Sequence, residues 1–252
     1  MIQIKDLRLY LFLFLPLLGI IGCLSTRNQP ATPSIIETTP ENGVKKMEID
    51  FQKGKAFNYP SFAVWVEDME GNYIETLYVT SYVASGKFRY AERSPGKWKN
   101  ESGEVRRAST LPYWAHKRNQ KAPDGLFVPS PETAVPDALT SATPKNNFTL
   151  ATSTSYTQEK SFRILMEINQ PWDSNEYWTN SKNPGEIDYI ISLQPAIVYA
   201  VTIDPEYPSD EFKLNPIGHS HPSGANGKLF TDLTTLTSAK EIAHQITVRL
   251  KE

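Results

Sequence analysis

The amino-acid sequence predicts an all-β fold: an antiparallel β-sandwich of immunoglobulin-like type with a long irregular insertion over about residues 84–146. Three observations lead to this fold class. Several short segments alternate apolar and polar residues at period two, turn-forming residues separate these segments, and helical periodicity is scarce. We therefore expect two packed sheets, with one side of an antiparallel sheet facing water.

The predicted strands share this alternation. Met47, Ile49 and Phe51 alternate with acidic residues, and residues 61–83 read as a β-hairpin with a turn at residues 69–71. Further strands are expected at residues 147–153, 161–169, 195–204, 211–219 and 244–250. Helical pattern is limited to two short segments, residues 111–121 and 236–244. The insertion between the hairpin and the next strand is long for a loop in a compact domain, and such loops are usually functional.

The N-terminus has the pattern of an export signal. Lys5 and Arg8 precede an apolar run over residues 9–21, which is too short for a permanent membrane span but suits a signal-peptide core. Gly22 then precedes Cys23, the only cysteine of the chain, and "LGIIGC" resembles the lipobox of bacterial lipoproteins. The resemblance implies that residues 1–22 are removed and that lipid on Cys23 holds the protein at a membrane. The alternative is a fortuitous signal-peptide tail with a reduced or buried thiol.

The segment after the cysteine predicts a tether. Residues 23–45 are rich in Pro, Thr, Ser and Asn, as expected for a solvated linker, so we expect one β-sandwich domain over residues 46–252. Leu24 stands where an aspartate often retains lipoproteins in an inner membrane, which favours the outer membrane within the periplasm and cell envelope. A net charge of −2 and a pI of about 6.1 provide no basic field, so nucleic acid is not an expected partner.

Several segments together carry a family resemblance. They are "FAVWVEDMEGNYIETLYVT", "LPYWAHKRN", "DGLFVPSPETAVPDALTSATPK", "MEINQPWDSNEYW", "QPAIVYAVTID" and "GHSHPSGANGKLFTDLTTLT". On these segments the chain resembles a bacterial family, domain of unknown function 2271. The resemblance implies a periplasmic β-rich protein, often associated with envelope redox systems that contain a flavin transferase and a peptidase-propeptide-like membrane protein.

The loop "DALTSAT" has two readings. As a turn, it is explained by the turn-forming residues around it, such as Pro136 and Pro144. It also resembles the target of covalent flavin attachment outside the cytoplasm, and the residues that fit that target are Asp137, Thr140, Ser141, Ala142 and Thr143. The resemblance implies that a flavin transferase joins the hydroxyl of Thr143 to the phosphate of flavin mononucleotide (FMN). Pro144 departs from the usual pattern and restricts Thr143 to extended geometry.

Aromatic residues near the motif are candidates to stack on a flavin ring. Trp98, Tyr113, Trp114 and Phe127 lie in the insertion before the motif. For Trp172, beside a predicted strand, core packing is the preferred interpretation.

A second motif, "GHSHPSGANGKLFTD", contains candidate metal ligands. His219 and His221 are two residues apart, and Asp232 follows at a spacing similar to that of the zinc site of JAMM metalloproteases. That pattern requires a serine where this chain has Leu229, and no obvious catalytic glutamate precedes it. The sequence therefore predicts no catalytic metal, and a non-catalytic metal site stays open.

The sequence leaves three functional interpretations. The first is a lipid-anchored periplasmic protein of an envelope redox system, with FMN on Thr143 and membrane redox proteins as partners. The second is a non-enzymatic β-sandwich binding or assembly module of the cell envelope. The third is a metal-binding protein that uses His219 and His221. No nucleophile has a visible base, so an enzyme is not expected.

Overall fold

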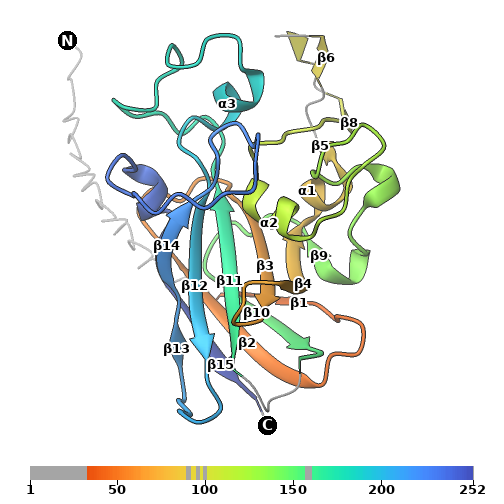
Figure 1. Ribbon diagram of the computed structural model, residues 1–252, viewed down its shortest axis with the longest axis vertical. Helices are drawn as coiled ribbons and strands as arrows, with labels where there is room; N and C mark the ends of the chain where they lie inside the picture. The colour runs from red at the N-terminus through yellow and green to blue at the C-terminus, as the bar shows by residue number, and fades with distance from the viewer. Residues whose placement is uncertain (1–32, 89–91, 95–96, 99–100, 157–160, 252) are drawn as a thin grey trace, which may run out of the picture. The chain divides into compact units, whose positions relative to one another are not determined.

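Two β-sheets pack face to face in the computed structural model, which describes residues 33–88, 92–94, 97–98, 101–156 and 161–251 (Figure 1). This arrangement confirms the predicted all-β sandwich. The described residues belong to one compact unit. The signal peptide and Cys23 lie outside the described residues.

One sheet presents a polar face to solvent. Within the described residues its order is β1-β10-β2-β15-β13. The bounds are Ser34–Glu37 (β1), Phe148–Thr154 (β10), Lys45–Lys53 (β2), Ala243–Leu250 (β15) and Phe212–Lys213 (β13). Along β2, Ile49 and Phe51 are buried, whereas Glu48 and Asp50 point outward and pair with Arg249 at 3.1 and 2.6 Å. The period of two therefore divides core from water, as predicted.

The other sheet is covered on both faces. Its order among the described residues is β14-β12-β11-β3-β4-β9. The bounds are Asn215–His219 (β14), Ile197–Ile203 (β12), Phe162–Asn169 (β11), Ser61–Glu67 (β3), Tyr73–Thr80 (β4) and Thr140–Ser141 (β9). Every residue of β3 is buried. Phe62 and Val64 face the space between the sheets, and Ala63 and Trp65 face outward into a second core.

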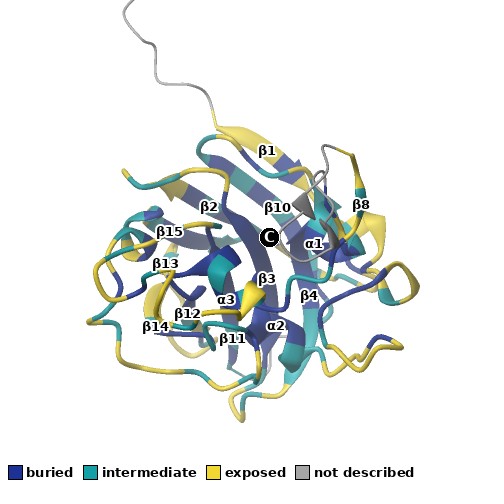
Figure 2. Ribbon diagram, turned by 90° about the horizontal axis from the view of Figure 1, so that it is seen from above, coloured by how far each residue is buried: buried dark blue, intermediate teal, exposed yellow. Residues whose placement is uncertain are grey.

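The insertion supplies that second core. Its elements are α1 (Ser81–Ser85), β5 (Lys87–Phe88), β6 (Glu92–Ser94), β7 (Lys97–Trp98), β8 (Gly103–Glu104), α2 (Pro112–Lys117), η1 (Pro131–Thr133) and η2 (Asp137–Leu139). Trp65 and Leu165 of the sheet pack with Leu111 and Trp114 of the insertion. Seen from above, β3 is buried and α2 is largely buried, while the surrounding loops are mostly intermediate or exposed (Figure 2). The described part of the insertion has only short elements, in line with the predicted irregularity, and it is packed because the apolar outer face of β3 requires a cover.

Two expectations need correction. The sandwich is not purely antiparallel, because β1 pairs in parallel with β10 and β9 pairs in parallel with β4. The predicted tether, residues 23–45, extends too far along the chain, because β1 lies within it and Ile36 is buried in the core. Local composition around Ile36 is that of a linker, and only pairing with β10 turns this segment into a strand.

The C-terminal third completes both sheets. The predicted strand over residues 211–219 divides between the sheets, because β13 pairs with β15 and β14 pairs with β12. Leu214 at the division is buried, and its N–H donates to the carbonyl oxygen of Ile246 at 3.0 Å. The remaining elements are α3 (Ile187–Ser192) and η3 (Ser238–Glu241). The described residues contain no helix with the length and apolar character needed to cross a membrane.

Glu167 joins the insertion to the sheet. It lies on β11, is fully buried, and its carboxylate accepts the N–H groups of Tyr113 (3.2 Å) and Trp114 (2.8 Å) at the start of α2. Burial raises the pKa of Glu167 to about 8, although the bonds from Trp114, Tyr113 and Ser220 act in the opposite direction. A carboxyl group is tolerated here because it satisfies backbone donors that would otherwise be buried without partners.

We predict a large loss of stability when the aromatic core between the sheets is opened. Phe51 is 1% exposed and its ring lies 5.0 Å from Phe148 and 5.2 Å from Phe62. Phe51→Ala is expected to lower the free energy of unfolding by about 3–5 kcal/mol, because it removes buried surface and leaves a cavity. Urea denaturation measures the change. Tyr207→Ala, at a site 74% exposed, is the control and is expected to change it by less than about 0.5 kcal/mol.

We also predict that Glu167 makes stability depend on pH. The folded protein keeps a proton on Glu167 up to a pKa of about 8, whereas the unfolded chain loses it near the ordinary value of 4.5. The contribution of this group to stability is complete below pH 4.5 and is lost as pH rises toward 8, by at most about 1.4 kcal/mol per pH unit. Relative to Glu167→Gln, wild-type stability should therefore fall between pH 5 and 8 in urea denaturation. Parallel curves for the two proteins would contradict this assignment.

Candidate functional site

The motif loop is held to the sandwich at both ends. Val135 before it and Pro144 after it are buried. Between them, η2 contains Asp137, and the strand β9 pairs with β4 through Thr140 and Ser141. The segment for which a turn was one of two readings therefore contains an ordered edge strand of the covered sheet.

The structure brings only part of the motif together. Thr143 is half-buried and Ala142 is exposed, and both line the same pocket. Asp137 is exposed, and in the described part of the chain no hydrogen bond joins its carboxylate to the hydroxyl of Thr143. Instead, the hydroxyl of Thr140 donates to the backbone oxygen of Asp137 at 3.1 Å. Asp137 thus has a place in the loop but no contact with the predicted acceptor.

A pocket of about 710 Å³ lies beside Thr143, and we call it the Thr143 pocket. It is lined by Tyr59, Ser61, Tyr82, Phe88, Arg107, Thr110, Ala142, Thr143, Lys145, Asn169, Pro171, Trp172 and Ile191. Its volume is in the range of small-molecule sites, about 300–1,000 Å³, and such sites combine apolar walls with a small number of polar groups. Thr143 also lines a smaller hollow of about 340 Å³ beside β1, so it borders open space on two sides.

Aromatic and cationic side chains meet inside the Thr143 pocket. The rings of Tyr82 and Phe88 lie 4.9 Å apart, and the Tyr82 hydroxyl is hydrogen bonded to Ser61 at 2.8 Å. The guanidinium carbon of Arg107 lies 4.1 Å from the centre of the Phe88 ring. The lining of this pocket thus combines aromatic and cationic side chains, although the Phe88 ring itself is buried beneath Arg107.

The rim of this pocket was missed by sequence reasoning. Trp172 is 54% exposed and Tyr59 is 59% exposed, so the expectation that Trp172 packs in the core was wrong. Trp172 follows Pro171 and Tyr59 precedes Pro60. An aromatic residue next to a proline, outside the alternating pattern of the strands, was the available signal.

The aromatic residues nominated from the sequence lie elsewhere. Tyr113 and Trp114 are buried in the second core, where the indole N–H of Trp114 donates to Thr76 at 2.9 Å. Phe127 packs against His116, with ring centres 4.3 Å apart. The side chain of Trp98 lies outside the described residues. These residues cannot be predicted as core or site from the sequence, because the face each one presents depends on how the insertion folds over the sheet.

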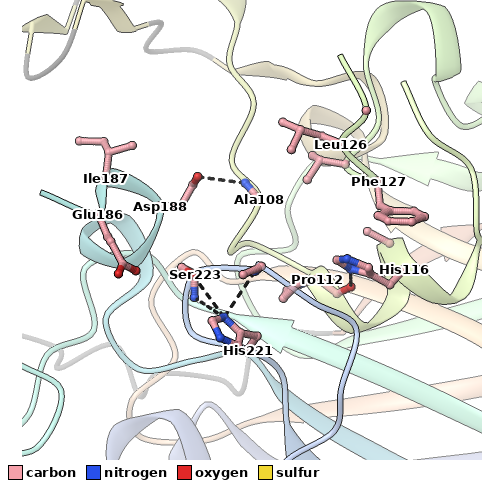
Figure 3. A pocket seen from close by; sticks show the side chains of 15 residues that line it. Ala108, Pro112, His116, Leu126, Phe127, Glu186, Ile187, Asp188, His221 and Ser223 are labelled. Atoms are coloured by element: carbon pink, nitrogen blue, oxygen red, sulfur yellow. Dashed lines mark hydrogen bonds between the residues drawn. The ribbon is translucent and has the colours of Figure 1, made fainter. Parts of the chain in front are cut away.

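A second pocket, of about 590 Å³, contains two histidines (Figure 3). Glu186 and Ile187 lie on one side of it and Leu126 and Phe127 on the other. His116 shares a hydrogen bond of 2.8 Å between its Nδ1 and the carbonyl oxygen of Pro112, so Nδ1 is the donor and Nε2 is the acceptor in the neutral ring.

His221 has the opposite tautomer. Its Nδ1 accepts the N–H of Ser223 at 3.2 Å and that of Ala225 at 3.4 Å, so Nε2 carries the proton in the neutral ring. The two histidines of this pocket therefore offer one acceptor and one donor, beside the carboxylate of Glu186.

The candidate metal ligands do not form a common site. β14 ends at His219, whose Nδ1 bonds to the carbonyl oxygen of Ser220 at 2.7 Å and whose ring stacks on Phe230. The carboxylate of Asp232 accepts the N–H and hydroxyl of Thr234. No group of three or more His, Cys, Asp or Glu side chains among the described residues is placed to hold a metal ion. The geometry thus gives the metal-binding interpretation no support.

Comparisons with family models, with curated proteins and with solved structures give no match. The resemblance to domain of unknown function 2271 therefore stays a prediction. Functional inference for this chain depends on the geometry of its own pockets.

The histidine environments predict distinct NMR behaviour. Burial lowers the pKa of both His219 and His221, so both rings should titrate below the ordinary value of 6.5 and be neutral at pH 7. Nitrogen-15 spectra should show the proton of His219 on Nδ1 and that of His221 on Nε2. Zinc at equimolar concentration is expected to leave both titrations unchanged. Joint loss of both titrations with zinc would instead establish a shared site.

Proposed function

We propose that this protein is a periplasmic lipoprotein of an envelope redox system, an electron carrier with FMN attached to Thr143. The observation that carries the proposal is that Thr143 lines a pocket walled by aromatic side chains and cations. The sequence motif nominates the hydroxyl, and the pocket offers a flavin-sized space next to it. The two lines of support are independent, because Tyr59, Tyr82, Phe88 and Trp172 lie outside the motif.

The residues of the pocket fit the parts of FMN. Aromatic walls suit the isoalloxazine ring, and Lys145 and Arg107 line the same space as Thr143, where the phosphate would be joined. When bound, the flavin supplies reversible uptake of electrons, and the protein contributes binding, orientation and charge. The support for this fit is the chemical type of these aromatic and cationic side chains and the fact that they line one pocket.

Attachment requires a separate flavin transferase. In that transfer the hydroxyl oxygen of Thr143 would form a bond to the flavin-bearing phosphorus of a flavin phosphoanhydride while the P–O bond of the anhydride breaks. The other phosphate half of the anhydride would leave with the bonding electrons and take up the hydroxyl proton. Thr143 has the access that such a partner needs, since Ala142 is exposed and the loop borders hollows on two sides. Ser141 and Ala142 are small and leave room for an enzyme to approach.

The membrane location belongs to the same proposal. Lipid on Cys23, placed by preference in the outer membrane, would anchor the chain, and the residues between Cys23 and β1 would act as a short linker. A tethered carrier meets membrane redox proteins at high effective concentration, so it does not need a tight interface with them.

A binding or assembly module is the second candidate, and exposed aromatic residues favour it. Tyr59, Trp172, Tyr177 and Phe230 are each more than a third exposed, and exposed apolar side chains are common in interaction surfaces. This candidate needs no cofactor. Measurement of covalent flavinylation distinguishes the carrier from the binding module, because only the carrier gains mass on Thr143.

We predict covalent flavinylation that depends on Thr143. The full chain is coexpressed in a periplasm with a flavin transferase, and intact mass and in-gel flavin fluorescence are measured. Wild type is expected to gain the mass of one FMN minus water, and Thr143→Ala should lose the gain because no hydroxyl remains. Thr202→Ala, which removes an exposed threonine hydroxyl on β12 outside both the motif and the Thr143 pocket, is the matched control and should keep it. Absence of the gain in wild type, while a control substrate is labelled, would leave the binding module as the better proposal.

A further inference from the structure

Tyr59 and Trp172 are unusual in both exposure and backbone conformation. Their side chains are 59% and 54% exposed at the rim of the Thr143 pocket. Their backbones are in the left-handed region, with φ of 52° for Tyr59 and 62° for Trp172. A bulky residue with positive φ is rare, because its Cβ crowds the backbone, and glycine or asparagine is the usual choice there.

Stability does not explain this combination. An aromatic side chain stabilises a fold by burial, and these two leave most of their surface in water. A left-handed backbone at a bulky residue costs free energy, and such strain concentrates at binding sites, where the surrounding structure imposes it. The ring at each position therefore serves something other than the core.

Hydrogen bonds from the scaffold hold both residues in place. The N–H of Trp172 donates to the carbonyl oxygen of Ile191 at 2.8 Å, and the next N–H, of Asp173, donates to that of Ser192 at 3.2 Å. The side chain of Gln170 accepts the N–H of Asn58, the neighbour of Tyr59, at 2.7 Å. The segment 170–172 thus supports the backbone at both rim residues, so the positions from which the two rings project are fixed before any ligand arrives.

The interior of the pocket indicates what the rim receives. Behind the rim lie the rings of Tyr82 and Phe88, with Arg107 over Phe88. Flat aromatic walls select a flat ring system, because stacking needs two planar faces. Arg107 and Thr143 line this same pocket, and a cation and a hydroxyl are groups that suit a phosphate.

We propose that Tyr59 and Trp172 form a preformed aromatic clamp that binds the isoalloxazine ring of a flavin reversibly, without covalent attachment. The inference rests on the proposed function for the identity of the ring, and it adds a binding step that does not require Thr143. Docking of the ring would raise the effective concentration of the flavin phosphate at the Thr143 hydroxyl. In the loaded protein, the same clamp would hold the ring against the sandwich.

The test is flavin binding by full-length protein in detergent, produced in a periplasm without a flavin transferase. Riboflavin, which has the ring but no phosphate, and FMN are titrated while quenching of flavin fluorescence is measured. Wild type is expected to give saturable 1:1 quenching with both probes. Riboflavin has no phosphate and no transferase is present, so quenching of its fluorescence reports reversible binding alone.

The clamp variants use asparagine, which tolerates the left-handed backbone. Trp172→Asn and Tyr59→Asn should each weaken riboflavin binding by roughly tenfold or more, whereas Trp172→Phe should keep most of it. The thermal midpoints of the two asparagine variants should be unchanged or raised by about 2–4 °C, because backbone strain is relieved and little buried surface is lost. Tyr207→Ala, an exposed tyrosine distant in sequence, is the control and should bind normally.

Three outcomes would overturn the clamp: no saturable quenching in wild type, asparagine variants that bind as tightly as wild type, or a fall in their thermal midpoints that accounts for the lost binding. The result for covalent attachment is separate. Riboflavin binding without a mass gain on Thr143 would refute the carrier proposal and leave the clamp standing. A mass gain on Thr143 without riboflavin binding would refute the clamp and leave the carrier proposal standing.

Discussion

The buried carboxyl group of Glu167 is the contact on which the two halves of this molecule depend. It lies on a central strand of the covered sheet and accepts the first N–H groups of α2, so it joins the insertion to the sandwich. A buried acid is costly, and it persists because removing it would leave backbone donors unsatisfied in an apolar core. Glu67 on the neighbouring strand adds a second link, since its carboxylate pairs with Lys117, the last residue of α2, at 3.3 Å.

The Thr143 pocket is a consequence of that link. Phe88 and Arg107 come from the insertion, Tyr59 from the loop before β3, and Trp172 from the loop after β11. None of these segments is adjacent in the chain. They meet only because the insertion packs on the outer face of the sheet and brings the motif loop back along β4. A shift of the insertion would separate the hydroxyl from the aromatic walls, so fold and site are coupled through the second core.

The strained rim fits a site built for a ligand. Folded proteins usually place glycine where φ is positive, and this chain does so at Gly71 and Gly86. At Tyr59 and Trp172 it keeps large rings in the same conformation and exposes them. The histidine pocket differs, because its imidazoles have internal hydrogen-bond partners and its walls carry no comparable strain among the described residues. The physical case for a ligand is therefore stronger at the Thr143 pocket.

The sequence by itself determined the sandwich and the strands that alternate at period two, and it supplied the motif. Alternation such as Ile49 and Phe51 against Glu48 and Asp50 depends only on the period of two of a strand, so it can be read locally. Tertiary structure decided the rest. Ile36 lies in a linker-like composition and becomes core through pairing with β10, and Trp172 lies beside a strand yet is exposed. Neither outcome follows from local pattern, because burial of a loop residue and the walls of a pocket depend on contacts between segments distant in the chain.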